Sequence, residues 1–579
     1  MAHSAAVTGR GPAMPPGGRA AGLFTKERLF FPALTIFVAV MVLSPLVMLL
    51  YGSLTSAPLG TWDSALSLAN YQRFLTSERY LGAFWNTIYV AIMTTVLGGG
   101  LGLLMAWLVV RTDVPMARGL RFGLMVPFFL SPLIGTLAWV TLTGKGAGPV
   151  NRLLDAVGLP MINLHGPGGI ILMMALYYAP YMFIFVSAAL ENMDASLEEA
   201  GSMCGLTRAQ VMRRITLPLM APAVLSGLVL TFVSAAGQFG VPALLGTPVN
   251  YLVMTTYIFD LTLTFPTRFN LAAALAVVLL LLSGGLLWAQ RRMMRGRAYT
   301  TVAGKGQRHR QIELGVWRWP VWGLVAAYIL LTAVLPILML AYVSLVPLYT
   351  GEINFSALTL TNYIGVLTEN QTTRRAVVNT LILSCGGATL GVVFGFLCSY
   401  ITQRTQAWYR GPLDYLVMLP AAVPSVVYGI AMLWTYIFVP LPIYGTLWLL
   451  LIGYVVGFIP FAYRAVNGSM AQIDKSLEEA AVMVGASWLR RIREVTLPLV
   501  KSGMVAGWML LFVIFVRELA VSIFLYSPGS EVLPVLVYNK YEEGQYPQLA
   551  AMAMLQVIFI SLIVFIVSRV FRVDVTRSS

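Results

Sequence analysis

Residues 196–219 read SLEEAGSMCGLTRAQVMRRITLPL, and residues 476–499 read SLEEAAVMVGASWLRRIREVTLPL. The two stretches are identical at 12 of 24 positions, with a constant offset of 280. The matches include polar pairs such as Ser196 with Ser476, which an apolar composition alone would not align. Weaker matches extend outward and pair Asn70 and Tyr71 with Asn362 and Tyr363, Asn86 and Thr87 with Asn379 and Thr380, Pro127 with Pro420, and Pro180 with Pro460. This repeat predicts two homologous domains joined in one chain.

Each copy of the repeat predicts a short helix, a glycine turn and a second short helix. In the first copy, Ser196 and Glu199 fit the S-x-x-E capping box that starts a helix. Gly205 stands where a helix would end in a left-handed turn, and Thr207 can cap a second helix that stops before Pro218. The same positions in the second copy hold Ser476, Glu479, Gly485, Ser487 and Pro498. Helix capping alone would equally account for the glutamates, but an ordinary connection between spans could be far shorter.

The rest of the chain is too apolar for a soluble core. Of its 579 residues, 58% are hydrophobic and 11% are charged, which is far from the globular average. Apolar runs of the length that crosses a bilayer recur along the chain and predict an all-α polytopic membrane protein. The twelve predicted spans lie near residues 29–51, 84–110, 123–144, 169–190, 221–244, 270–289, 320–346, 377–401, 412–436, 445–466, 501–526 and 548–569.

Lys and Arg concentrate in the segments that a cytoplasmic N-terminus would place inside the cell, led by the basic stretch 290–319 between the two halves. Positively charged loops stay on the cytoplasmic side, so both termini are predicted to be cytoplasmic. The net charge of +15 is spread over separate loops next to membrane helices. It therefore indicates topology and contact with anionic membrane lipid, and not a nucleic-acid-binding surface.

These observations divide the chain into two membrane domains with flanking segments, each domain preceded by one extra helix. The predicted segments are a disordered cytoplasmic tail at 1–28, the first span and its outer loop at 29–81, the first membrane domain at 82–289 with the loop 191–220, the basic linker at 290–319, the seventh span and its outer loop at 320–374, the second membrane domain at 375–569 with the loop 467–500, and a cytoplasmic tail at 570–579.

Charged side chains within the predicted spans are candidates for a transport path, because intramembrane charge is costly and usually functional. Arg517 and Glu518 fall inside the eleventh predicted span, and the corresponding place in the fifth span holds Gly237 and Gln238. The functional hypothesis is that Gln238, Arg517 and Glu518 line a translocation path or its gate. The structural alternative is an ion pair with a neighbouring helix. Asn86 and Asn379 are more simply interpreted as hydrogen-bonding residues between helices.

Catalytic, nucleotide and metal sites have little support in the sequence. There is no G-x-x-x-x-G-K-[ST] phosphate loop, and the three histidines and three cysteines show no metal-ligand spacing. An integral membrane enzyme is disfavoured because no Ser-His-Asp or Cys-His arrangement is present. An ion-coupled secondary transporter would also have repeats and twelve spans, but it would have no need of two helical cytoplasmic loops.

The repeated stretch resembles the cytoplasmic loop signature of ABC importer permeases, which reads E-A-A, three residues, Gly, nine residues, I-x-L-P. The matching residues are Glu199, Ala200, Gly205, Ile215, Leu217 and Pro218 in the first copy, and Glu479, Ala480, Ala481, Gly485, Leu497 and Pro498 in the second. Gly201 departs from the third motif position, and Val495 replaces the isoleucine. The resemblance implies a fused two-domain permease whose two coupling loops dock on two copies of a separate cytoplasmic ATPase.

The same resemblance implies further partners and a cargo. ATP and Mg²⁺ would be bound by the ATPase, with no cofactor on this chain, and a periplasmic or extracellular binding protein would deliver the solute to the bacterial inner membrane. The doubled architecture and the run 517–519 are similar to permeases for iron(III), although Gln238 stands where an acidic residue would be expected. Similar machinery serves thiamine, phosphonates and polyamines, so these remain alternative cargoes.

Overall fold

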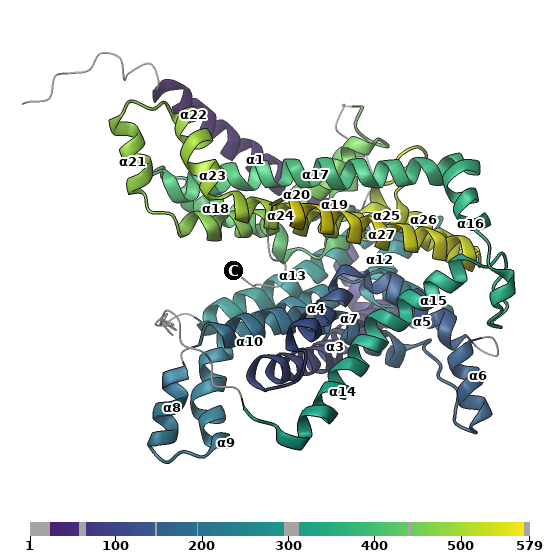
Figure 1. Cartoon of the computed structure of the whole chain (residues 1–579). Helices are drawn as coiled ribbons and strands as arrows, with labels where there is room; N and C mark the ends of the chain where they lie inside the picture. Colours follow the sequence, from purple (N-terminus) through teal and green to yellow (C-terminus); the bar gives the residue numbers. More distant parts are fainter. Residues whose placement is uncertain are drawn as a thin grey trace, which may run out of the picture.

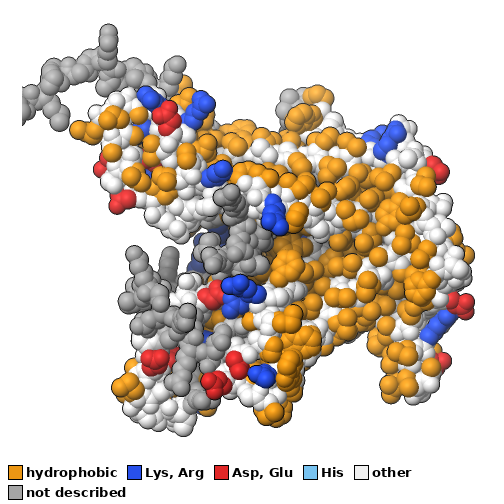
Figure 2. Space-filling model, viewed as in Figure 1, with side chains coloured by type: hydrophobic (Ala, Val, Ile, Leu, Met, Phe, Trp, Pro, Cys, Tyr) orange, Lys and Arg blue, Asp and Glu red, His pale blue; other side chains and the backbone are white. Residues whose placement is uncertain are grey.

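The computed structural model describes residues 24–56, 65–144, 148–193, 195–294, 312–437 and 442–571. Within these ranges the chain is a bundle of helices with no β-strand beyond two isolated backbone bridges (Figure 1). Nine described helices are long and apolar enough to cross a membrane, and three bent helix pairs bring the number up to twelve. Figure 2 shows a broad apolar surface between two ends where charged side chains gather. The predicted all-α polytopic fold is confirmed.

The spanning elements of the two halves correspond one to one. In the first half they are α1 (Phe24–Ser53), α3 (Glu78–Arg111), α4 (Ala117–Phe129) with α5 (Pro132–Thr143), α7 (Pro167–Glu191), α10 (Leu217–Ala236) and α13 (Phe269–Met294). In the second half they are α14 (Arg318–Ile329) with α15 (Leu335–Ser344), α17 (Gln371–Arg404), α18 (Arg410–Met418) with α19 (Ser425–Ile437), α20 (Leu447–Ala471), α24 (Lys501–Val516) and α27 (Tyr546–Phe571).

The predicted spans 123–144 and 412–436 are not single helices. The chain bends by 94° between α4 and α5, and by 109° before α19. The residue before a proline avoids the helical region, and proline has no N–H to continue the ladder. Ser131 before Pro132 and Val423 before Pro424 are both extended, with ψ of 137° and 121°. The Ser131–Pro132 and Val423–Pro424 steps therefore break both spans, although the hydropathy of each segment predicted one continuous helix.

Other predicted boundaries also shift. The fifth and eleventh spans end at Ala236 and Val516, short of the predicted 244 and 526, because the chain leaves the helix there and enters short helical turns. Residues 24–28 belong to α1 although they were assigned to the tail, and the linker ends at 290–294 and 318–319 belong to α13 and α14. The remaining parts of the two tails and the linker, 1–23, 295–311 and 572–579, lie outside the described residues.

The extra helix of each half packs across the other half. α1 lies against α13 of its own half and against α18 and α19 of the second half, while α14 and α15 lie against α27 and against α4 and α5 of the first half (Figure 1). Trp139 Nε1 donates to the carbonyl of Leu331 at 3.1 Å, and the Tyr328 hydroxyl donates to the carbonyl of Leu176 at 2.7 Å. The two halves are therefore interlocked by an exchanged helix on each side.

Buried asparagines fix the outer loops in both halves. Asn70 donates to the carbonyls of Ser53 and Thr55, and Asn362 donates to those of Ser344 and Val346, at distances of 2.7 to 3.1 Å. Asn86 and Asn379 likewise donate to backbone carbonyls of distant segments, at Leu252, Gly529 and Glu531. Asn86 and Asn379 are hydrogen-bonding residues as expected, but their partners are loop carbonyls and not a neighbouring helix. These four asparagines of the weaker matches form contacts that close the fold.

Glycines allow α3 to pack closely on α7. A Cβ atom on Gly102 would lie 2.2 Å from the Ala179 carbonyl oxygen, and one on Gly98 would lie 2.9 Å from that of Ala175. Small residues let helix backbones approach in this way where lipid gives no hydrophobic driving force. Gly100, on the same helix, has open space at its Cβ position. The glycine-rich run is thus a packing surface at some positions and an exposed surface at others.

Gly102→Ala is expected to lower the melting temperature of the purified protein, because the added methyl group forces two helix backbones apart at a cost of about 1–3 kcal/mol. Gly100→Ala is the matched control, since it gains the same helix propensity without a clash. Thermal unfolding in detergent measures both. Equal melting temperatures for the two variants would contradict the close-packing interpretation of Gly102.

Candidate functional site

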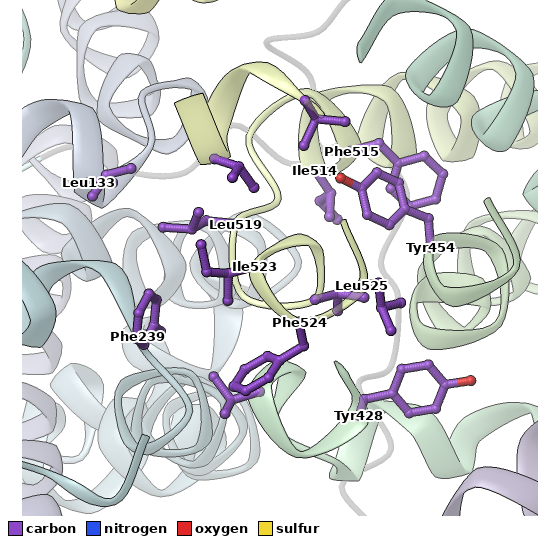
Figure 3. Close-up of a cluster of buried hydrophobic side chains, with 14 of the residues drawn as sticks. Leu133, Phe239, Tyr428, Tyr454, Ile514, Phe515, Leu519, Ile523, Phe524 and Leu525 are labelled. Atoms are coloured by element: carbon purple, nitrogen blue, oxygen red, sulfur yellow. The ribbon is translucent and has the colours of Figure 1, made fainter. Parts of the chain in front are cut away.

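A cavity of about 200 Å³ lies between the two halves where four breaks in spanning helices meet. Its lining comes from the α4–α5 break, the end of α10, the α18–α19 break and the segment after α24, together with residues of α7 and α20. Figure 3 shows this last segment curling through the centre of the molecule, with Leu519 and Ile523 lying between first-half residues Leu133 and Phe239 and the second half. The predicted path residues Gln238, Arg517 and Glu518 all line the cavity.

Arg517 bonds across the interface between the halves. It caps the end of α24 with non-helical backbone angles and is not inside a span as predicted. Its Nη1 donates to the Phe128 carbonyl and lies 3.5 Å from that of Leu130, and its guanidinium carbon is 4.9 Å from the centre of the Phe128 ring. The α4–α5 break leaves these carbonyls outside the helix, so the arginine of one half satisfies the broken backbone of the other.

Glu518 forms its hydrogen bond within its own half of the chain. Its Oε1 accepts a hydrogen bond of 2.9 Å from the backbone N–H of Val521, next to the short helix α25 (Ser522–Leu525). A carboxylate at a helix start satisfies free N–H groups and complements the helix dipole. Arg517 and Glu518 therefore bond in different directions. The structural alternative from the sequence was an ion pair with a neighbouring helix, and Arg517 instead binds carbonyl groups of that helix.

Gly237 occupies the corresponding position in the first half. A Cβ atom there would lie 2.9 Å from Cβ of Pro424, at the α18–α19 break of the second half. The neighbouring Gln238 lines the cavity, and its backbone carbonyl accepts a 2.8 Å bond from Thr255. Each half thus contacts the broken helix of the other half. The first half does so by direct packing of Gly237, and the second half does so through the Arg517 hydrogen bonds. This difference makes the centre of the molecule asymmetric.

The repeated stretches form two helical hairpins at one end of the molecule (Figure 1). The first loop hairpin is α8 (Ala195–Met203) with α9 (Arg208–Val211), and the second is α21 (Ser476–Met483) with α22 (Trp488–Arg491). Gly205 and Gly485 are in the left-handed region, with φ of 83° and 78°. The N–H groups of Gln210 and Arg490 donate to the hydroxyls of Thr207 and Ser487, both at 3.4 Å. The predicted glycine turns and second caps are confirmed.

Two local predictions for the hairpins are wrong. Ser476 is the first residue of α21, and its N–H donates to Asp474 Oδ1 at 2.9 Å, so the aspartate and not a Ser-Glu capping box starts this helix. Ser196 lies inside α8. The second short helices also do not stop before the prolines. Each passes its proline through a π-helical turn, at Met212–Thr216 and Ile492–Thr496, which accommodates the missing proline N–H. The first copy then continues into α10, whereas the second ends with α23 (Leu497–Leu499) and the chain bends by 73° before α24.

The motif residues predicted to contact an ATPase lie on the hairpins, apart from Leu217, Pro218, Leu497 and Pro498, which lie just beyond them at the start of the next helices. All are exposed except Ala481, which is half-buried: Glu199, Ala200, Gly205, Leu217, Pro218, Glu479, Ala480, Gly485, Leu497 and Pro498. Apolar side chains accompany them at both tips, where Met203 is 88% exposed and Met483 is 83% exposed. Figure 2 shows these two protrusions with apolar and charged side chains intermixed. Exposed apolar groups rimmed by polar ones are typical of protein interaction sites.

The two positions that depart from the loop signature pack against each other, and their side-chain sizes compensate. A Cβ atom on Gly201 would lie 2.5 Å from Cδ1 of Ile215, so the glycine makes room for the longer side chain. The second copy has Ala481 and Val495 at the corresponding positions, where the larger residue faces the shorter one. Both hairpins therefore keep the same total volume between their arms, which packed cores tolerate best.

The sequence analysis missed the inward-facing glutamate of each copy. It singled out Glu199 and Glu479, but Glu198 and Glu478 are the residues that pair with Arg111 and Arg404, each at 3.2 Å. The repeated Glu-Glu pair was visible in the sequence. The arginines could not be assigned to it because they lie 87 and 74 positions away in other helices. Within the described residues, no group of three His, Cys, Asp or Glu side chains could hold a metal ion.

Comparison with known proteins identifies relatives along most of the chain. The family model described as "Binding-protein-dependent transport system inner membrane component" matches residues 98–296 and 391–576. The ferric transport system permease protein FbpB of Actinobacillus pleuropneumoniae is 26% identical over 501 residues, which cover 85% of this chain and 70% of the relative. The probable ABC transporter permease protein y4fN of Sinorhizobium fredii is 26% identical over 532 residues, covering 89% and 91%.

Among solved structures, a crystal structure of a bacterial alginate ABC transporter in complex with an alginate pentasaccharide-bound periplasmic protein aligns with a TM-score of 0.40. The identity is 21%, and the alignment covers 48% of this chain and 95% of that chain.

Gly201→Ala and Ile215→Val are expected to compensate each other, because together they recreate the pair present in the second hairpin. The double variant should be more stable than the sum of the single variants by about 1 kcal/mol. Hydrogen exchange of the amides in α8 and α9 measures this local stability. Ala481→Gly with Val495→Ile is the reciprocal control in the second hairpin. Strictly additive effects at both sites would contradict the compensation.

Proposed function

This chain belongs to the family of binding-protein-dependent transport system inner membrane components, and we propose that it is the membrane-spanning subunit of an ATP-driven importer for iron(III). It is a multi-pass inner-membrane protein in which the two permease domains form one polypeptide. The observation that carries the proposal is the pair of exposed loop hairpins with a repeated signature at one end of an interlocked bundle. A transporter driven by two identical ATPase subunits needs two equivalent docking sites.

The proposed orientation places both hairpins in the cytoplasm together with both termini. The start of α1 is at this end, because the Phe30 ring lies 5.8 Å from that of Trp488 in α22. The end of α27 is there too, since Lys501 at the start of α24 lies 5.0 Å from the Phe571 ring. This arrangement agrees with the positive-inside rule applied to the basic linker between the halves.

In the proposed mechanism, ATP hydrolysis belongs to the partner and this chain carries no enzymatic activity. Two copies of a cytoplasmic ATPase bind the hairpins through Glu199, Glu479 and their neighbours, with ATP and Mg²⁺ held by the ATPase. Closure of the ATPase dimer draws the hairpins together and reorients the two halves around the central cavity. A periplasmic or extracellular binding protein presents the solute at the opposite end.

The cavity is the proposed path, lined by Gln238, Arg517 and Glu518. The two halves contribute different residues to this path, whereas the two docking hairpins are nearly identical. In this proposal, two equivalent ATPase contacts therefore move two unlike walls of the path.

Iron(III) is the proposed cargo because the relatives that match most of this chain include ferric transport permeases. The cavity offers one carboxylate, at Glu518, and the phenol groups of Tyr178, Tyr181 and Tyr428. Because the Arg517 cation stands beside that carboxylate, a hard trivalent cation would bind there only transiently, which suits passage better than storage.

Reconstitution tests the proposed function. The chain is placed in liposomes with its cognate ATPase, and iron-loaded binding protein is supplied on the outside. Uptake of labelled iron is expected to depend on ATP, and charge reversal by Glu199→Arg with Glu479→Arg is expected to abolish it, because two anionic docking contacts become repulsive.

Glu313→Arg, an exposed charge reversal at the same end of the molecule but outside both hairpins, is the matched control and should transport normally. Thiamine, phosphonate or polyamine uptake in place of iron would overturn the cargo and leave the permease function intact. Uptake driven by an ion gradient without ATP would instead identify a secondary transporter.

Arg517→Gln is expected to reduce iron uptake about tenfold, because it removes charge-assisted bonds that close the junction between the halves. Glu518→Gln should have a weaker effect, since an amide oxygen still accepts the Val521 N–H. Arg569→Gln, at the end of α27, is the control for loss of a positive charge. Unchanged uptake in both the Arg517 and the Glu518 variants would remove these residues from the path.

A further inference from the structure

A three-residue cluster fixes the first loop hairpin to two spanning helices. Glu198 of α8 accepts bonds from Arg111, from Nη1 to Oε2 at 3.3 Å and from Nη2 to Oε1 at 3.2 Å. Thr216 donates its hydroxyl to the same Oε1 at 2.7 Å. Arg111 is the last residue of α3, and Thr216 ends the π-helical turn at the base of α10. One carboxylate therefore joins the hairpin to α3 and α10.

The second half repeats this cluster with equivalent residues. Arg404 Nε lies 3.2 Å from Glu478 Oε1, and Thr496 donates to the same oxygen at 2.9 Å. Arg404 is the last residue of α17, and Thr496 ends the π-helical turn before α24. Tyr400 adds a bond of 3.4 Å to Glu478 Oε2. The cluster thus joins this hairpin to α17, the counterpart of α3, and to α23 (Leu497–Leu499), which leads into α24 across a bend of 73°.

The arginines are held inside the protein, with side chains only 2% and 4% exposed at Arg111 and Arg404. A buried charge is tolerated when it is paired and hydrogen-bonded, and removing its partner is strongly destabilising. The bidentate contact of Arg111 also fixes the angle between the hairpin and the helix, and not only their distance. Each cluster is therefore a rigid joint at the base of a hairpin.

Each joint also reaches the helix exchanged from the other half. The backbone carbonyl of Arg111 accepts from Ile312 at 2.8 Å, and Asp113 accepts from the N–H of Leu314, just before α14. At the second joint the Tyr400 ring lies 6.1 Å from that of Phe31 in α1, and Phe31 also contacts Trp488 of the hairpin. A movement of either hairpin is thereby applied to spanning helices of both halves.

We propose that Glu198 with Arg111 and Thr216, and Glu478 with Arg404 and Thr496, are positioning residues that transmit ATPase movement from the hairpins to the spanning helices. This inference rests on the proposed function. Successive residues of a helix point about 100° apart, so the adjacent glutamates divide two tasks. Glu199 and Glu479 are exposed for docking, and Glu198 and Glu478 face inward and hold the joint.

The test uses the complete transporter in liposomes and compares iron uptake per ATP hydrolysed. The joint variants are Glu198→Gln with Glu478→Gln, and Thr216→Val with Thr496→Val. The threonine pair leaves both ion pairs in place and so tests the joint without an unpaired buried charge. Both pairs are expected to assemble with the ATPase and hydrolyse ATP while uptake per ATP falls about tenfold, a typical size for coupling between two sites.

Glu199→Gln with Glu479→Gln is the matched control, and it should weaken ATPase binding without lowering uptake per ATP in the complexes that form. Adding Arg111→Gln and Arg404→Gln to the Glu198 and Glu478 variants should restore part of the coupling, because the buried charges then disappear together. Unchanged uptake per ATP in the threonine variants would overturn the joint. Failure of the unmodified chain to bind an ATPase would instead overturn the proposed function.

Discussion

Backbone groups released by a broken helix cannot bond to water inside a bilayer, and this constraint shapes the centre of the molecule. Prolines break one spanning element in each half, and the residues that follow the ends of the fifth and eleventh spans line the same cavity as these breaks. The released groups are satisfied by the opposite half through Arg517, or within the same half through Glu518 and Thr255. The halves must therefore meet at their breaks, and the cavity lies where they meet.

The exchange of the first helix of each half follows from the same constraint. Because α4 and α5 are bent relative to each other, one straight helix cannot pack along both. Instead, α14 packs on α4 and α15 packs on α5, and both come from the other half. α1 covers α18 and α19 in the same way, with Phe31, Leu34, Val38, Val42 and Leu49 buried along one face. The two halves are therefore held together by helices that each half places on the other.

The two halves are alike in their hairpins and unlike where they face each other. The two hairpins keep the same glycine turn, the same second cap and the same buried cluster of arginine, glutamate and threonine. Even their sequence differences cancel, since Gly201 with Ile215 fills the same space as Ala481 with Val495. At the centre, the first half supplies Gly237, which packs directly against Pro424, and the second supplies Arg517, which forms hydrogen bonds. The cavity between the halves is therefore bounded by two unlike surfaces.

The sequence by itself determined the membrane fold, the duplication and the hairpins, because apolar length, repeated polar residues and left-handed glycines are local properties of the chain. It also indicated Arg517 and Glu518, since charge within a span is rare, and Gln238, since it stands at the position of the repeat that corresponds to Glu518. Only the tertiary structure decided that two spans are broken, that Arg517 bonds to the other half, and that Glu198 and Glu478 hold the hairpins. The partners of Arg517, Glu198 and Glu478 lie tens to hundreds of positions away in the sequence, so a local pattern cannot identify them. The broken spans were missed because a hydropathy average over a whole span does not respond to one X-Pro step.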